Sequence, residues 1–317
     1  MDAELGDATS GRPRSAKGAL ILFAALSSAG WTPASAQIKA TIIPPPRLDV
    51  PVSVSDAEAR RKTRRVTLRK IILVGDSTVQ VGTGWGGVFC AMHVAAFTPC
   101  IDMALGGRST LSYRAEGSWG IALKEAGVGG FSRVYVLIQF GHNDQPGKPG
   151  QSTDLETEFP QNLRQYVLEA RSVGAIPVLV TPLTRRDFVD GSLQDTLAPW
   201  ADKVISVAKE LNVPLVDLHK MSVDYVQALG PVASLDLSVN KPPRAVVEAA
   251  KRGTSLGAFK PGVRQSDKTE VAVGERTPPP ITFDYTHLGP KGAEVFSTEV
   301  AKALVVAVPD LRGQVIP

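Results

Sequence analysis

The chain is short of cysteine and histidine, which narrows the metal chemistry open to it. Its 317 residues include two cysteines, Cys90 and Cys100, and four histidines. Two cysteines without CxxC spacing do not make a zinc site by themselves. If the protein is exported they could be joined as a disulfide, and the alternative is two separate buried thiols. The sequence leaves both interpretations open.

Long apolar runs are also missing beyond the N-terminal region. After residue 36 no stretch approaches the roughly 18 continuous apolar residues of a membrane-spanning helix. No repeat with a period of about 20 to 50 residues is visible either. These absences argue against a membrane-embedded protein, a solenoid and a propeller. We expect a soluble mature protein that does not bind membranes.

Charge of one sign is not in large excess, since 35 Lys and Arg stand against 31 Asp and Glu, a net charge of +4. Much of the basic charge is local, because Arg60 to Lys70 (RRKTRRVTLRK) is dominated by Lys and Arg. Such a run is typical of a solvated arm, and the alternative is attraction to an anionic polymer. No aromatic residues interleave with it and no nucleic-acid-binding motif is present, so we expect no nucleic-acid partner.

The N-terminal region has the parts of an export signal in the right order. A basic region is followed by the mostly apolar residues 18–31, too short to span a bilayer, and then by Ala34-Ser35-Ala36, a small-x-small cleavage pattern. We predict that residues 1–36 are a signal peptide and that the protein is exported, to the periplasm or the extracellular space. The alternatives are an N-terminal anchor helix or a disordered tail. The basic residues are Arg12, Arg14 and Lys17.

Apolar runs alternate with helix-like patterns from residue 70 onward. Apolar residues at helical spacing occur in three segments, and a last helix is expected from Pro290 to about residue 308. Strands alternating with helices predict a parallel sheet covered on both faces. We expect a three-layer α/β/α sandwich with a flavodoxin-like sheet. The predicted strands are 71–74, 101–105, 134–140, 176–181 and 215–218, and the helical segments are 85–92, 163–170 and 200–211.

We therefore divide the rest of the chain into two parts. Residues 37–69 are a linker that ends in the basic arm, and residues 70–317 form one α/β domain. Inside this domain, residues 231–280 are rich in Pro, Lys and Gly and have weak periodicity. We interpret them as a long loop insertion with a helix near 245–251. Long loops are usually functional or disordered, and the sequence does not distinguish the two.

Four short polar stretches each follow a predicted strand or precede a predicted helix. Open α/β sheets bind ligands in the loops at the carboxyl ends of their strands. We therefore expect the four stretches to gather at one edge of the sheet. Each stretch taken alone is also compatible with an ordinary turn or a helix cap. They are GDST at 75–78, GGRS at 106–109, GHND at 141–144 and DYTH at 284–287.

Together the four stretches supply each role that a hydrolytic serine needs. Ser77 is the candidate nucleophile, near a helix N-terminus that favours developing negative charge. His287 is the candidate base, and Asp284, three residues earlier, can accept a hydrogen bond from its imidazole and fix its tautomer. The N–H groups of Ser77 and Gly107 and the side-chain amide of Asn143 are the candidate oxyanion donors.

The other three histidines are not assigned to catalysis. We expect His142 to pack or to position its neighbours rather than to bind a ligand. His93 and His219 lie in predicted secondary structure, with no partner nearby in the sequence.

The ordered set of stretches resembles the sequence blocks of the SGNH (GDSL-like) hydrolase superfamily. Within it the chain is most similar to the rhamnogalacturonan acetylesterase-like group. That group also has Gly-Trp-Gly after GDST, here Gly84-Trp85-Gly86, and a Ser-Tyr-Arg-like run, here Ser112-Tyr113-Arg114. The similarity continues through FGHND and THLGPKGAEV and covers about residues 70–308. The 231–280 segment and the basic arm depart from the pattern, and both bear on substrate specificity.

The resemblance implies an SGNH hydrolase domain that hydrolyses esters without a metal or cofactor. The family's nucleophile, acid and base fall on Ser77, Asp284 and His287, and its oxyanion donors fall on Ser77, Gly107 and Asn143. The implied reaction is removal of acetyl groups from a polysaccharide such as pectin or rhamnogalacturonan. A lipid esterase, thioesterase or lysophospholipase is the alternative within the same fold. The oligomeric state is not predicted.

Three further classes are weaker alternatives. A metallophosphoesterase would need an early Asp-x-His pair, which the chain lacks. A nucleotide-binding module would need GxGxxG directly after the strand, but Asp-Ser-Thr intervenes before the glycines at 82, 84 and 86. A non-catalytic sugar-binding relative would have no need of Ser77 and His287 together. The metal ligands on the first alternative would be Asp76, His142, Asn143, Asp144, Asp284 and His287.

Overall fold

The computed structural model describes residues 68–257 and 282–317. The predicted signal peptide (1–36) and nearly all of the predicted linker (37–69) lie outside these residues, so both stay predictions. No helix within the described ranges combines the length and apolar character that crossing a membrane requires.

The core of the molecule is one parallel sheet of five strands in the order β2-β1-β3-β4-β7. Along the chain the sheet strands follow each other as first to fifth, so the spatial order is 2-1-3-4-5. This is the flavodoxin-like order that the sequence predicts. Each predicted strand overlaps an observed one. The strands are β1 (Arg69–Gly75), β2 (Cys100–Asp102), β3 (Arg133–Gln139), β4 (Ile176–Val180) and β7 (Leu215–Val216).

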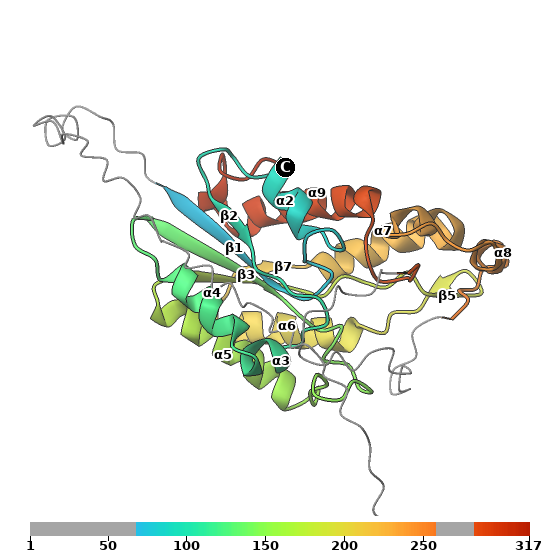
Figure 1. Cartoon of the computed structure of the whole chain (residues 1–317), viewed down its shortest axis with the longest axis horizontal. Helices are drawn as coiled ribbons and strands as arrows, with labels where there is room; N and C mark the ends of the chain where they lie inside the picture. Colours follow the sequence, from blue (N-terminus) through green and yellow to red (C-terminus); the bar gives the residue numbers. More distant parts are fainter. Residues whose placement is uncertain (1–67, 258–281) are drawn as a thin grey trace, which may run out of the picture. The chain divides into compact units, whose positions relative to one another are not determined.

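Helices cover both faces of this sheet, as Figure 1 shows. Alternate residues of β1 point to opposite faces. Ile71 and Leu73 belong to one apolar cluster, and Ile72 and Val74 to the other. The first face is covered by α2 (Gly86–Met92), α7 (Leu218–Ala233) and α9 (Pro290–Ala307), and the second by α4 (Ser118–Ala126), α5 (Glu158–Ser172) and α6 (Ala198–Glu210). The predicted α/β/α sandwich is confirmed.

Several elements were not predicted. The missed helices are α3 (Ser112–Ala115), α4 and α7, and a small antiparallel hairpin joins β5 (Phe188–Val189) to β6 (Ser192–Leu193). Strand β2 ends at Asp102, short of the predicted residue 105, and the Asp102 carboxylate accepts a hydrogen bond from the Ala104 N–H at 3.0 Å. The chain still follows β1 beyond this point, because the N–H groups of Met103 and Leu105 donate to the carbonyls of Leu73 and Gly75 at 2.9 and 3.0 Å. A short 3₁₀ helix at Pro309–Leu311 follows α9.

The segment 231–280 is not simply a long loop. It begins inside the end of α7, directly after Gly230, whose positive φ of 74° interrupts the helix. A 3₁₀ helix (Ser234–Leu237) and α8 (Arg244–Lys251) follow, and α8 coincides with the helix expected near 245–251. The helix expected near 245–251 is therefore confirmed, and the prediction of a loop is wrong at residues 231–237. Residues 258–281 lie outside the described part of the chain.

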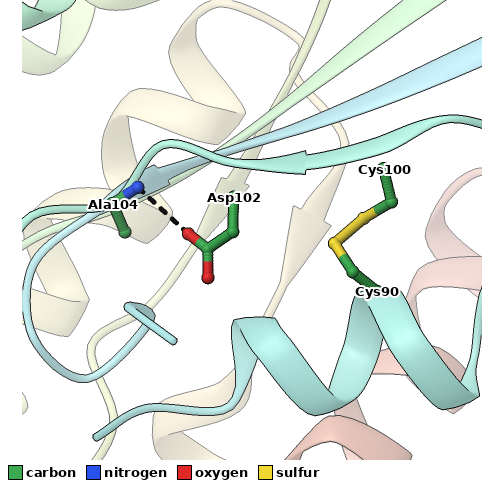
Figure 2. Close-up of a disulfide and its surroundings, with 4 residues drawn as sticks. All are labelled: Cys90, Cys100, Asp102 and Ala104. Carbon is green, nitrogen blue, oxygen red and sulfur yellow. Dashed lines mark hydrogen bonds between the residues drawn. A yellow bond between two sulfur atoms is a disulfide. The ribbon is translucent and has the colours of Figure 1, made fainter. Parts of the chain in front are cut away.

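Cys90 and Cys100 are joined as a disulfide that links the end of α2 to the start of β2 (Figure 2). Their Cα atoms lie 5.3 Å apart. The carboxylate of Asp102 lies farther along β2, on the way to the loop that carries the GGRS stretch. The bond therefore ties the first helix after the GDST stretch to the strand that leads into GGRS.

Candidate active site

Three predicted site residues from two distant parts of the chain lie in one hydrogen-bonded row. His287 Nδ1 is 2.7 Å from Asp284 Oδ2, and His287 Nε2 is 2.8 Å from Ser77 Oγ. An ionised carboxylate can only accept hydrogen bonds, so Nδ1 carries the ring proton and donates a hydrogen bond to Asp284. Nε2 is then the ring atom with a free lone pair, and it accepts the hydrogen bond from the Ser77 hydroxyl. This is the geometry of an activated nucleophile.

Asp284 is itself held by the turn that carries His287. Its Oδ1 accepts hydrogen bonds from the backbone N–H groups of Thr286 and His287, both at 2.7 Å. Burial would raise the pKa of Asp284, but the bond and the charge of His287, together with these two N–H groups, lower it to about 2. The carboxylate is therefore ionised at any pH near neutrality.

The turn that carries Asp284 and His287 is held by a buried guanidinium that the sequence analysis did not predict. Arg186 is buried, and it donates hydrogen bonds to the carbonyl oxygens of Asp284 (3.2 Å), Thr286 (3.2 Å) and His287 (2.9 Å). The backbone N–H of Arg186 donates to the carbonyl of Tyr285 at 2.9 Å. Burial lowers the pKa of Arg186 to about 10, so the side chain is still charged at neutral pH. One residue, through its side chain and its backbone, thus donates to every carbonyl of the turn.

A buried polar network supports the GDST stretch on the other side of the site. Asp76 Oδ1 accepts from the N–H and the hydroxyl of Thr78 at 2.8 and 2.7 Å. The Thr78 hydroxyl in turn accepts from Gln139 at 2.7 Å, and Gln139 accepts from the indole N–H of Trp85 at 2.9 Å. These bonds run from one side chain to the next and hold Thr78, Gln139 and Trp85 in a single arrangement.

Gly84 explains part of the glycine-rich segment that follows Ser77. A Cβ atom at this position would lie 2.2 Å from the carbonyl oxygen of Thr78. The next residue donates its N–H to the same carbonyl, since Trp85 N is 3.1 Å from Thr78 O. The glycine therefore permits a close approach of two backbones, and the structure gives this pattern a packing role.

The GGRS loop lies directly beside Ser77. A Cβ atom built on Gly106 would be 3.6 Å from Ser77 Cβ, and the Gly106 N–H donates to the side chain of Gln80. Gly107 has a positive φ of 76°, a conformation that side chains disfavour. Among the described residues, nothing accepts a hydrogen bond from the backbone N–H of Ser77 or of Gly107.

Asn143 joins the GHND stretch to the same loop. Its Nδ2 donates to the carbonyl of Arg108 at 3.0 Å, one residue after Gly107. The next carboxylate, Asp144, is fully buried and accepts from the Thr110 N–H at 3.0 Å and from the Thr153 hydroxyl at 3.1 Å. Burial raises the pKa of Asp144 to about 7. The three predicted oxyanion donors are therefore brought to adjoining loops.

His142 is buried among charged groups. Its Nδ1 lies 3.5 Å from Asp76 Oδ2, and burial lowers the pKa of His142 to about 4. The imidazole is therefore neutral at physiological pH and packs behind the GDST stretch. It does not lie in the row of Ser77, His287 and Asp284.

Two further pairings were not predicted, and the first of them lies beside Asn143. Lys148 Nζ donates to the Asn143 side chain at 2.7 Å and to the His142 carbonyl at 2.8 Å. His219, which had no partner nearby in sequence, pairs with Asp195 at 3.0 Å. The sequence feature that could have identified Lys148 is its position five residues after Asn143 in the same loop. The partner of His219 lies 24 positions away, beyond any local pattern.

The chain is similar to known proteins in sequence and in fold. The model of the GDSL-like lipase/acylhydrolase family matches residues 73–233, about half of the chain. Two curated proteins of Bacillus subtilis (strain 168) are similar in sequence. Rhamnogalacturonan acetylesterase RhgT is 36% identical over 178 residues, 54% of this chain and 73% of RhgT. The probable rhamnogalacturonan acetylesterase YesY is 32% identical over 166 residues, 50% of this chain and 75% of YesY.

One solved structure supports the fold. The crystal structure of the protein YxiM from Bacillus subtilis has a TM-score of 0.53 and 22% sequence identity to this chain. The match covers 75% of this chain and 56% of YxiM, so the chain spans little more than half of that relative. The chain belongs to the GDSL-like lipase/acylhydrolase family, and it is a carboxylic ester hydrolase.

Proposed function

We propose that the protein is a serine esterase that removes acetyl groups from a polysaccharide through an acyl-enzyme on Ser77. One observation carries the chemical part of this proposal. The Ser77 hydroxyl, the His287 imidazole and the Asp284 carboxylate form a continuous chain of hydrogen bonds of 2.8 and 2.7 Å. That chain can move a proton away from Ser77 at the moment when its oxygen attacks.

In the first half of the reaction Ser77 Oγ forms a bond to the ester carbonyl carbon, and its proton passes to His287 Nε2. The carbonyl electron pair moves to oxygen, and the resulting oxyanion accepts hydrogen bonds from Ser77 N, Gly107 N and Asn143 Nδ2. Asp284 stabilises the imidazolium. The carbon–oxygen bond to the sugar then breaks, and the departing oxygen takes the proton from His287.

In the second half a water molecule attacks the acetyl group on Ser77. His287 accepts the proton of this water as the new carbon–oxygen bond forms, and the same oxyanion donors hold the negative charge. The bond to Ser77 Oγ breaks, His287 returns the proton to Oγ, and acetic acid leaves. The enzyme is restored, and no other reactant is consumed.

The substrate proposal rests on the relatives. RhgT is a rhamnogalacturonan acetylesterase and YesY a probable one, and this chain covers 73% and 75% of their lengths. The positive net charge of +4 agrees with an anionic polymer as substrate. An acetylated pectic polysaccharide is therefore the substrate class that we propose.

A lipid esterase is the second candidate, and exposed apolar side chains favour it. Val81 follows Ser77 on its loop and is 62% exposed, while Leu105 and Leu111 flank the GGRS stretch and are 38% and 39% exposed. Apolar groups around a reactive serine could receive an acyl chain.

A substrate panel tests both candidates. We expect purified protein to release acetate from acetylated rhamnogalacturonan and little fatty acid from a lysophospholipid. The Ser77→Ala variant should keep its fold and lose activity by a factor of about 10⁴ or more. Fatty-acid release without acetate release would favour the lipid esterase. Activity of Ser77→Ala at the wild-type level would refute the serine mechanism.

We also propose that the protein is exported, with cleavage after Ala36. The order of basic region, apolar run and small residues supports this, as does the Cys90–Cys100 disulfide, because such bonds persist in oxidising compartments. Mass spectrometry of protein from the periplasm or medium should find a chain that begins at Gln37. A full-length chain found in the cytoplasm alone would contradict this.

A further inference from the structure

The side chain of Asn143 has its orientation fixed by two partners of opposite kind. The carbonyl oxygen of Arg108 can only accept, and it lies 3.0 Å from Asn143 Nδ2. The ammonium group of Lys148 can only donate, and its Nζ lies 2.7 Å from Asn143 Oδ1. Since neither partner could serve the reversed amide, the NH₂ group must face the GGRS loop and the oxygen must face the lysine.

This orientation leaves one N–H of Asn143 for the substrate. The NH₂ group has two hydrogens, and the bond to Arg108 uses one of them. A cation that donates to the amide oxygen draws electron density toward that oxygen, so the N–H groups at the other end become stronger donors. The effect would be largest when negative charge develops on a neighbouring oxyanion.

Lys148 is held in place for this contact by its own loop. Its Nζ also donates to the His142 carbonyl at 2.8 Å, and its backbone N–H donates to the Ser152 hydroxyl at 2.9 Å. The same hydroxyl donates to the Gln145 carbonyl at 2.8 Å. Lys148 is only half-buried, yet its cationic end is directed at the side chain and backbone of the GHND stretch.

We propose that Lys148 is a positioning residue that fixes and polarises Asn143 as an oxyanion donor. The inference rests on the esterase function proposed above. It goes beyond that function by making one donor of the oxyanion site depend on the charge of a residue that does not touch the substrate.

The charges around Lys148 make this dependence visible in a pH profile. Burial and the positive charge of Arg185 lower the pKa of Lys148 to about 8, against the opposing effect of the carboxylates of Asp76 and Asp144. His142 is neutral in this pH range, because burial lowers its pKa to about 4. Lys148 therefore loses its charge as the pH rises through about 8, and kcat should fall to a lower plateau.

A double-mutant cycle tests whether Lys148 acts through Asn143. We expect Lys148→Met to lower kcat for p-nitrophenyl acetate about tenfold and to leave KM within about twofold. Asn143→Ala should lower kcat about 100-fold, the usual cost of one oxyanion donor. In the Asn143→Ala background, Lys148→Met should change kcat by less than about twofold. Losses that multiply in the double variant would overturn the proposal.

Two controls keep the result interpretable. Lys220→Gln removes an exposed lysine that pairs with Asp224 on α7, and kcat should not change. The rate with Ser77→Ala protein is subtracted at every pH, because the substrate hydrolyses spontaneously in alkali. If this subtraction removed all activity difference, the esterase proposal would fail. If the activity depends on Ser77 but the losses from Lys148→Met and Asn143→Ala multiply in the double variant, only the role of Lys148 is refuted and the esterase proposal stands.

The pH profile decides the question if Lys148→Met does not fold. Wild-type kcat should decline as the pH rises through about 8, while Lys148→Arg, whose guanidinium stays charged, should keep its kcat up to about pH 10. The same alkaline decline in both proteins would contradict a role for the charge of Lys148.

Discussion

Two hydrogen-bonded histidine–carboxylate pairs in the described part of the chain differ in the partner of the second ring nitrogen. His287 Nδ1 lies 2.7 Å from Asp284, and its Nε2 meets the Ser77 hydroxyl at 2.8 Å. His219 Nε2 lies 3.0 Å from Asp195, but its Nδ1 meets the carbonyl of Pro182 at 3.1 Å. The first pair ends on a group that can donate a proton, and the second ends on a group that can only accept.

The difference shows why a histidine beside a carboxylate is not by itself a base. His219 faces an acceptor at each ring nitrogen, so both nitrogens must carry hydrogen for both contacts to be hydrogen bonds. Burial would lower the pKa of His219, but the bond and charge of Asp195 and the Pro182 carbonyl raise it overall. In its protonated form this ring has no lone pair for a substrate proton. We interpret it as a structural link between α7 and the loop before α6.

Replacing each histidine by glutamine should give the largest contrast between the two pairs. His287→Gln should lower kcat/KM for p-nitrophenyl acetate by about 10⁴-fold or more, because the attacking serine loses its base. His219→Gln should leave kcat/KM within about threefold of wild type, provided that circular dichroism shows an unchanged fold. A large loss in both variants would mean that the two pairs do not differ as described.

A smaller effect should appear in the pH dependence of stability. The pKa of Asp284 is lowered from 3.8 to about 2 in the folded protein, which corresponds to about 2 kcal/mol of stabilisation by the ionised carboxylate. This contribution is complete above about pH 5 and is lost as the pH falls through about 2. Asp284→Asn should therefore be less stable than wild type by about 2 kcal/mol at pH 7 and 5, and by about half of that at pH 3.

Urea unfolding of wild type and Asp284→Asn at these three pH values measures that difference. The matched control is Asp195→Asn, which removes the carboxylate of the other pair and should leave catalysis largely intact. A stability gap for Asp284→Asn that stays constant or widens at pH 3 would show that the Asp284 carboxylate is not stabilised in the folded state.

Much of the fold could be predicted because apolar strands and amphipathic helices leave strong periodic signals. The site residues could be predicted because a parallel sheet brings its carboxyl-end loops together, which places Ser77 and Asn143 on adjoining loops. Helix α4 was missed because its buried face consists of one tryptophan and the small residues Ala122 and Ala126, which give a weak apolar pattern. Strand β2 has only three residues, and so short a strand leaves no sequence pattern from which its ends can be predicted.

The supporting residues could not be predicted, for a different reason. Arg186 acts on backbone carbonyls about 100 positions away, and every residue type has such a carbonyl, so nothing in the sequence identifies the partner. Lys148 acts on a side-chain amide whose orientation is defined only when its other partner, the carbonyl of Arg108, is known. Contacts of this kind are specified by the folded backbone.

The most direct test of the central claim is covalent labelling with diethyl p-nitrophenyl phosphate, which phosphorylates activated serines. Intact-protein and peptide mass spectrometry should find one diethyl phosphoryl group on wild type, on the peptide that contains Ser77, together with complete loss of esterase activity. His287→Gln should react at least about 100-fold more slowly, because its serine lacks a base, while His219→Gln should react like wild type. A label on another residue, or equal labelling of wild type and His287→Gln, would contradict the assignment of Ser77 and His287.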